Sequence, residues 1–213
     1  MRDPVLQRRI PTAILLGVIT LISVLDWMHG FGDWMMVPAN VVGGWENLRS
    51  GDFSQGTLFA LATTLTSGFL HADLSHLGGN MLFLWLFGVV VSELCGWRWM
   101  VLAFLITAIG GSVGQIMLNP ESGIPVLGAS GGLMGVEGFY FGLAFQHSRP
   151  DSHVWPLARP VSSTQLAAAG VVGISFDFMG LMGPGMNVAY GAHIGGFVTG
   201  IFLSIIADRF VRR

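Results

Sequence analysis

Six long apolar stretches follow one another along the chain, separated by shorter polar segments. They lie at residues 11–28, 74–94, 99–118, 129–146, 165–182 and 188–207. A helix needs about 20 apolar residues to cross a bilayer. All six stretches are near that length, and the fourth and fifth are the shortest. The pattern predicts an all-α membrane protein, a bundle of six transmembrane helices.

The connection between the first two stretches, residues 30–66, is long and mixes apolar with polar residues. Trp34, Trp45 and Phe53 stand in it among Gly and Asp. Because Trp is favoured at the boundary between membrane and water, we expect this connection to lie at the membrane interface.

The first stretch follows three arginines and could be a signal peptide. However, Asp26, Trp27 and His29 occupy the place where a cleavage site would need small residues. We therefore expect a retained helix, with residues 1–213 forming one membrane domain.

Composition agrees with a membrane protein. Hydrophobic residues make up 52% of the 213 positions and charged residues 10%, whereas soluble domains carry about 25% charge. The single cysteine, Cys95, excludes an internal disulfide and any CxxC metal or redox motif. The chain has no basic patch for nucleic acid.

The arginines indicate an orientation. With six spans and a cytoplasmic N-terminus, only Arg49 lies outside, and the others fall on the cytoplasmic side: Arg2, Arg8, Arg9, Arg98, Arg149, Arg159, Arg209, Arg212 and Arg213. Cytoplasmic loops of membrane proteins are enriched in arginine and lysine. The distribution therefore predicts cytoplasmic N- and C-termini.

Four polar residues lie within the apolar stretches, where each is costly. His76 and Asn80 share one helix face, Ser130 opens the fourth stretch, and His193 lies in the sixth. Any one of them could be a packing residue bonded to a neighbouring carbonyl. Together, on three short helices, they could converge on one cavity.

Small residues four apart allow helix backbones to approach closely. Such glycine pairs occur in the fourth and sixth stretches: Gly131/Gly135, Gly191/Gly195 and Gly196/Gly200. Close backbones are what a short serine and an imidazole need in order to meet. The same glycines also serve ordinary helix packing.

Gly128-x-Ser130-x-Gly132 also fits the nucleophile elbow of α/β-hydrolases, and Ser130, Asp177 and His193 follow the chain order of that fold. An elbow requires a preceding parallel sheet. Three membrane-length stretches precede Ser130 instead, so we reject this reading.

The ordered motifs resemble those of the rhomboid intramembrane serine proteases of the bacterial six-helix type. The resemblance covers nearly the whole chain and rests on His71-Ala-Asp-Leu-Ser-His76-Leu-Gly-Gly-Asn80, Gly128-Ala-Ser130-Gly131 and Gly191-Ala-His193-Ile-Gly-Gly196. It implies a Ser–His dyad with Ser130 as nucleophile and His193 as general base. It also implies an oxyanion hole formed by His76, Asn80 and the Ser130 backbone N–H.

The resemblance further implies an endopeptidase that cleaves transmembrane proteins in the bilayer without cofactor or metal. We expect it in the bacterial inner (plasma) membrane, with the long first connection lying partly in the membrane. The active site would open to the outer face, where Ser130 begins its helix.

Two positions depart from the family pattern. Met134 stands where the family usually has Tyr or Phe against the catalytic histidine. The Trp-Arg pair usual in the first connection, shortly before Thr66, is replaced by Ala62-Thr63, and Trp97-Arg98 lies on the cytoplasmic side. These departures concern the orientation of the histidine and the anchoring of the connection.

Two other membrane functions remain as alternatives. One is a catalytically silent rhomboid-like protein that binds membrane proteins for quality control, although such a protein would be expected to lose Ser130 or His193. The other is a small transporter with a proton relay, for which two similar halves would be expected. The chain has no HExxH metalloprotease motif.

Two acidic residues have no assigned catalytic role. Glu137 lies on the same helix face as Ser130 but about 10 Å deeper, too far for direct proton transfer. It is expected to be a protonated or hydrogen-bonded bundle residue, with water access as the alternative. Asp177 precedes the turn between the last two stretches, and nothing in the pattern requires it to orient His193.

Overall fold

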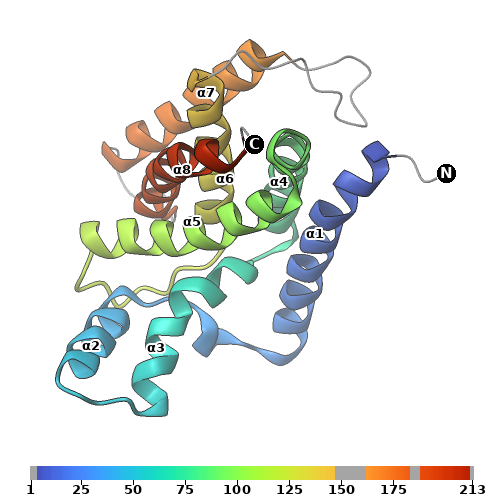
Figure 1. Ribbon diagram of the computed structural model, residues 1–213. Coiled ribbons are helices and arrows are strands. Elements are labelled where there is room, and N and C mark those ends of the chain that lie inside the picture. Colours follow the sequence, from blue (N-terminus) through green and yellow to red (C-terminus); the bar gives the residue numbers. More distant parts are fainter. Residues whose placement is uncertain (1–3, 147–161, 183–187, 212–213) are drawn as a thin grey trace.

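Helices, with one isolated antiparallel bridge between Met36 and Val126, make up the secondary structure of the described residues, 4–146, 162–182 and 188–211, in the computed structural model (Figure 1). In chain order they are α1 (Pro4–His29), η1 (Gly32–Trp34), α2 (Pro38–Arg49), α3 (Gln55–Thr66), η2 (Ser67–Phe69), α4 (Leu74–Cys95), α5 (Trp97–Leu118), α6 (Ser130–Gln146), α7 (Ser163–Met182) and α8 (Tyr190–Val211).

Each of the six predicted stretches corresponds to one helix. Among the described residues, four helices are long and apolar enough to cross a bilayer: Arg9–His29 of α1, α4, α5 and Tyr190–Ala207 of α8. The other two are outside this set: α6 has 17 residues, and α7 has 20, of which the apolar part with described side chains is Thr164–Ser175. The prediction of an all-helical membrane protein is confirmed, with four candidate spans.

The long connection 30–66 is mostly helical, which the sequence pattern did not indicate. Its two helices, α2 and α3, lie together at one end of the molecule, at the bottom left of Figure 1. Pro38 starts α2, where its missing N–H costs nothing. Ser54 caps α3 by accepting a hydrogen bond from the Thr57 N–H at 3.4 Å.

Helix α6 packs against α5 and α8 at the centre of the bundle. Its backbone touches α8 so closely that a methyl group at Gly196 would collide with the Gly131 carbonyl, and one at Gly200 with the Gly135 carbonyl. The predicted role of these glycines in helix packing is therefore confirmed. Gly195 instead faces α5, where a methyl group would lie 2.8 Å from the Gly114 Cα.

Glu137 is buried between α6 and α7. Its side chain belongs to a residue only 1% exposed, and Gly170 of α7 packs directly against the carboxyl. This placement agrees with a bundle residue that faces α7. Asp177 lies in α7, but its side chain is outside the described part of the chain.

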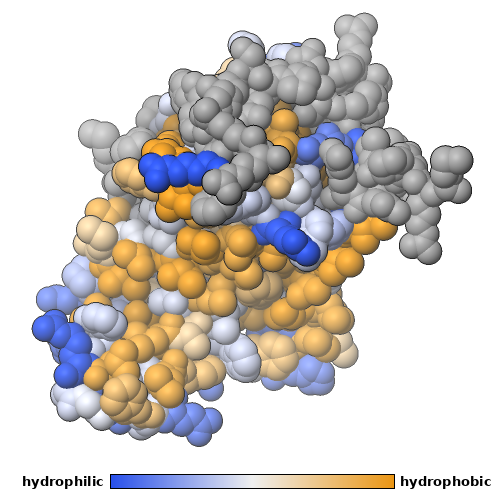
Figure 2. Space-filling view, viewed as in Figure 1, coloured by the Kyte–Doolittle hydropathy of each residue, from blue (hydrophilic) through white to orange (hydrophobic). Residues whose placement is uncertain are grey.

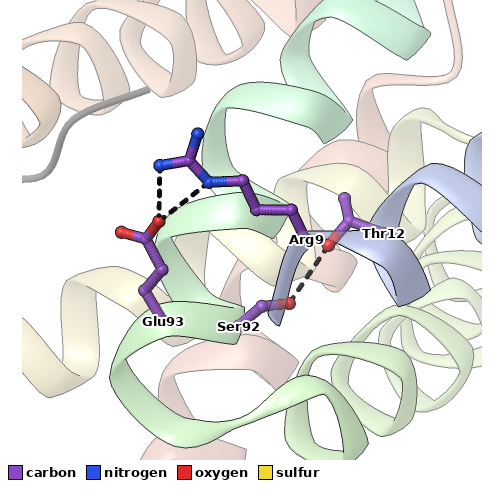
Figure 3. A network of polar contacts seen from close by, with 4 residues as sticks. All are labelled: Arg9, Thr12, Ser92 and Glu93. Carbon is purple, nitrogen blue, oxygen red and sulfur yellow. Dashed lines mark hydrogen bonds and ion pairs between the residues drawn. The ribbon is translucent and has the colours of Figure 1, made fainter. Parts of the chain in front are cut away.

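Two polar contacts join α1 to α4 (Figure 3). Arg9 donates from Nη2 and Nε to Glu93 Oε1 at 2.9 and 3.1 Å. One turn further along, Thr12 Oγ1 lies 3.1 Å from Ser92 Oγ. These contacts hold the N-terminal part of α1 against the C-terminal end of α4.

Apolar side chains cover a broad band of the face shown in Figure 2. Large hydrophobic residues with more than half of their surface exposed occur on several helices, among them Leu21, Met28, Leu82, Met117 and Phe202. Such an exposed apolar surface is favourable in contact with lipid chains and unfavourable in contact with water. Five arginines used in the orientation argument lie outside the described residues: Arg2, Arg149, Arg159, Arg212 and Arg213.

Candidate functional site

A glycine turn places Ser130 at the start of α6. Gly128 has φ +125°, a conformation that side chains other than glycine rarely adopt. A methyl group at Gly128 would also lie 2.8 Å from His76 Cε1 and 2.9 Å from His76 Nε2. Glycine at position 128 therefore permits the turn and leaves room for the imidazole beside Ser130.

Contact between α6 and α8 joins the residues next to Ser130 and His193. Ser130 precedes Gly131, and His193 follows Ala192. A methyl group at Gly131 would lie 3.3 Å from the Ala192 carbonyl oxygen and 3.6 Å from the Ala192 Cβ. Both residues of the predicted dyad are half-buried, so water could reach them.

Helix α4 contributes His76 and Asn80. Asp73 caps this helix by accepting the His76 N–H at 2.8 Å. Hydrogen bonds from Ser75 and from the His76 backbone N–H lower the pKa of Asp73, because they stabilise the charged form of the capping carboxylate. The His76 imidazole lies within electrostatic range of His193.

Asn80 lies one turn deeper than His76 and is 9% exposed. Its Nδ2 is buried and has no hydrogen-bond partner among the described residues. An unpaired buried donor lowers the stability of the fold, and such a donor is typical of a group that has a function. The structure thus places the His76 ring beside the turn that precedes Ser130 and within electrostatic range of His193, with Asn80 on the face of α4 that bears His76.

Two residues without a role predicted from the sequence, Tyr190 and His71, contact the candidate site. The Tyr190 ring lies edge-on to His193, with centroids 6.4 Å apart and planes at 82°, a favourable aromatic geometry. Tyr190 and His193 are three residues apart on one helix, and residues at this spacing lie on the same face, so the sequence offered a signal for this contact. His71 contacts His76 with ring centroids 5.0 Å apart.

Met134, at the position where an aromatic residue was expected, is buried in the core. An aromatic ring does lie against His193, but it is the ring of Tyr190 on α8 and not a ring at position 134 on α6. In the part of the chain that the structure describes, no group of three or more His, Cys, Asp or Glu residues could hold a metal ion.

Comparison with known proteins identifies the family. The family model for the rhomboid domain matches residues 59–210, which is more than half of the chain. The chain is 30% identical over 139 residues to "Rhomboid protein 1, mitochondrial" of Saccharomyces cerevisiae, covering 63% of this chain and 38% of that protein. It is 26% identical over 149 residues to "Rhomboid protease GluP" of Bacillus subtilis, covering 70% and 26%.

A third relative is "Rhomboid-like protein 11, chloroplastic" of Arabidopsis thaliana, 35% identical over 72 residues, covering 34% of this chain and 25% of that protein. The chain thus matches less than half of the length of each of these relatives. The domain match and the apolar helices together make it an integral membrane protein, and the chain belongs to the rhomboid family.

Proposed function

We propose that this chain is an intramembrane serine endopeptidase that hydrolyses peptide bonds in or near transmembrane segments of membrane proteins. The observation that carries the proposal is the meeting of three helices at Ser130. The close backbone contact of Gly131 with Ala192, the residues next to Ser130 and His193, supports the dyad, and the His76 ring beside Gly128 supports the oxyanion hole.

In the proposed reaction, His193 takes the proton from Ser130 as the hydroxyl oxygen attacks the scissile carbonyl carbon. The protonated His193 then gives this proton to the leaving amine as the scissile C–N bond breaks, which forms the acyl-enzyme. Water, activated by the neutral His193 in the same way, hydrolyses the acyl-enzyme and releases Ser130. We assign no carboxylate to orient His193, in contrast to a Ser-His-Asp triad. The Tyr190 ring at 6.4 Å and the tight packing of α8 on α6 would hold the imidazole in its place.

The negative oxygen of the tetrahedral intermediate needs hydrogen-bond donors, because an oxyanion is costly in a site of low polarity. The proposed donors are Asn80 Nδ2, the His76 imidazole and the Ser130 backbone N–H. The unpaired state of Asn80 Nδ2 supports this role, since the donor is available to the intermediate.

The proposed topology has six spans within one rhomboid-like domain, residues 1–213, with α6 crossing the membrane inside the bundle and α7 crossing it at the edge, against α8. Seventeen helical residues in α6 extend about 25 Å, which suits a span covered by other helices. The arginine distribution supports cytoplasmic termini. We propose location in a bacterial plasma membrane, with transmembrane proteins as substrates and no cofactor.

A serine-directed fluorophosphonate or isocoumarin probe tests the proposal. We expect the purified protein in liposomes to be labelled and to cleave a single-span substrate, and Ser130→Ala to lose both properties. Ser175→Ala, which changes an exposed serine of α7, is the matched control and should keep both. Labelling that persists in Ser130→Ala would contradict the assignment of the nucleophile. Ion or solute flux without labelling would favour a transporter.

Replacing Asn80 by alanine is expected to lower kcat by about 100-fold, the usual cost of losing one oxyanion donor. KM and thermal stability should change little, because Nδ2 has no partner among the described residues to lose. Steady-state kinetics and thermal unfolding measure the two effects. Asn40→Ala, on the exposed surface of α2, is the control. An Asn80→Ala protein that mainly unfolds would make Asn80 a structural residue.

A further inference from the structure

His71 lies fully buried between α1 and the turn before α6, with both ring nitrogens engaged. Nδ1 is 2.9 Å from Ser23 Oγ of α1, and Nε2 accepts the Ala129 backbone N–H at 3.3 Å. The His71 carbonyl oxygen accepts a third bond, from Trp27 Nε1 at 2.6 Å. Its side chain therefore links α1 to the backbone that directly precedes Ser130.

The partners of the ring determine its protonation. A backbone N–H can only donate, so Nε2 must be the unprotonated nitrogen and Nδ1 must carry the hydrogen. Ser23 agrees with this, because its hydroxyl donates to the Phe69 carbonyl oxygen at 3.0 Å and its lone pair is left to accept from Nδ1. Burial, with a smaller contribution from His76, lowers the pKa of His71 to about 4, so the ring is neutral at physiological pH.

The ring also supports both sides of the proposed oxyanion hole. Its edge-to-face contact with the His76 ring, with centroids 5.0 Å apart, places it against one proposed donor. Its bond to Ala129 fixes the chain next to another, the Ser130 N–H. The preceding amide is held in the same way, since the Gly128 N–H donates to the Ser67 carbonyl oxygen at 3.0 Å.

We propose that His71 is a positioning residue that, through Ser23 on one side and Ala129 on the other, aligns the Ser130 backbone with the His76 imidazole. His71 touches no substrate in this role. It acts as a neutral acceptor whose orientation is determined by α1, so that helix α1 contributes to the geometry of a site formed by α4, α6 and α8. The inference rests on the proposed protease function.

The test compares His71→Leu, which removes the acceptor, with His71→Gln, whose amide oxygen can still accept the Ala129 N–H. We expect His71→Leu to lower kcat by about 10- to 100-fold with little change in KM, because a displacement of about 1 Å at a catalytic group costs up to about 100-fold. His71→Gln should restore part of the loss. Trp27→Phe, which removes the bond to the His71 carbonyl and leaves both bonds of the His71 ring in place, is the control for disturbance of the same segment.

Inhibitor binding separates positioning from a general loss of structure. A peptide aldehyde that forms a tetrahedral adduct with Ser130 should bind His71→Leu more weakly in proportion to kcat, whereas a non-reacting product peptide should bind unchanged. Equal weakening of both ligands, or an unchanged kcat in folded His71→Leu, would overturn the proposal. If His71→Leu does not fold, Ser23→Ala replaces it, with a smaller loss of kcat expected and an unchanged kcat as the contrary result.

The ¹⁵N chemical shifts of the His71 ring give a readout that does not depend on cleavage. We expect a neutral ring protonated at Nδ1 from neutral pH down to about pH 5, since its pKa is lowered to about 4. A ring protonated at Nε2, or charged at neutral pH, would overturn the inference even if the protein is a protease. Cleavage that persists in Ser130→Ala would instead contradict the proposed function.

Discussion

Ser130→Ala and His193→Ala are each expected to reduce the cleavage rate of a membrane-spanning substrate by at least about 10⁴-fold. Ser130 supplies the attacking oxygen and His193 the base, so removal of either leaves only binding and oxyanion stabilisation. Residues that act as a unit are not additive. The double variant should therefore be about as inactive as either single one, which purified protein in liposomes would show.

The controls for this experiment are residues of the same type away from the site. His29→Ala, at the end of α1, should retain the activity of the unchanged protein, and thermal unfolding should show that all variants remain folded. Substantial cleavage by either dyad variant would contradict the mechanism. An unaltered protein that neither cleaves nor reacts with the serine probe would favour the catalytically silent alternative.

Gly196→Val is expected to abolish cleavage without touching any catalytic side chain. The first carbon of a side chain at position 196 would collide with the Gly131 carbonyl, so α8 must move away from α6 next to the proposed dyad. Overpacking of this kind typically costs about 1–3 kcal/mol of stability. Cleavage and thermal unfolding should therefore both fall, and cleavage should fall the more strongly.

Gly17→Ala is the matched control for this substitution. Gly17 also lies in an apolar helix, but nothing is within 4 Å of the position that a methyl group would occupy. Alanine is the better helix former by about 1 kcal/mol, so this variant should be active and at least as stable as the unchanged protein. A Gly196→Val protein with normal activity would show that α6 and α8 can separate without loss of function.

The predictions made from the sequence are correct where they depend on local properties, such as the length and hydropathy of one segment. Membrane-length apolar stretches predicted the helices to within a few residues for α4 and α5, because length and hydropathy alone indicate a span. The connection 30–66 was predicted to be a membrane-interface segment, but its helices α2 and α3 were missed. Their composition is mixed, and a capping serine and an N-terminal proline are weak signals by themselves.

The candidate site shows the same division. Ser130, His76, Asn80 and His193 could be named from their residue types and spacing, and their roles stay predictions. His71 could not be assigned a contact, because its partners Ser23 and Ala129 lie far away in the chain. Tyr190 was missed, although its spacing of three residues from His193 was a local signal. Nothing in the sequence shows that Ser23 lies against His71, 48 positions away in the chain.

By itself, the sequence determined that the chain resides in a membrane, because a chain with 52% hydrophobic and 10% charged residues lacks the surface for water. It also supplied the glycines that allow helices to touch. Only the tertiary structure decided which helices those glycines join, with Gly196 against α6 and Gly195 against α5. The physical reason is that helix periodicity is a local property, whereas the choice of partner depends on packing between segments far apart in the chain.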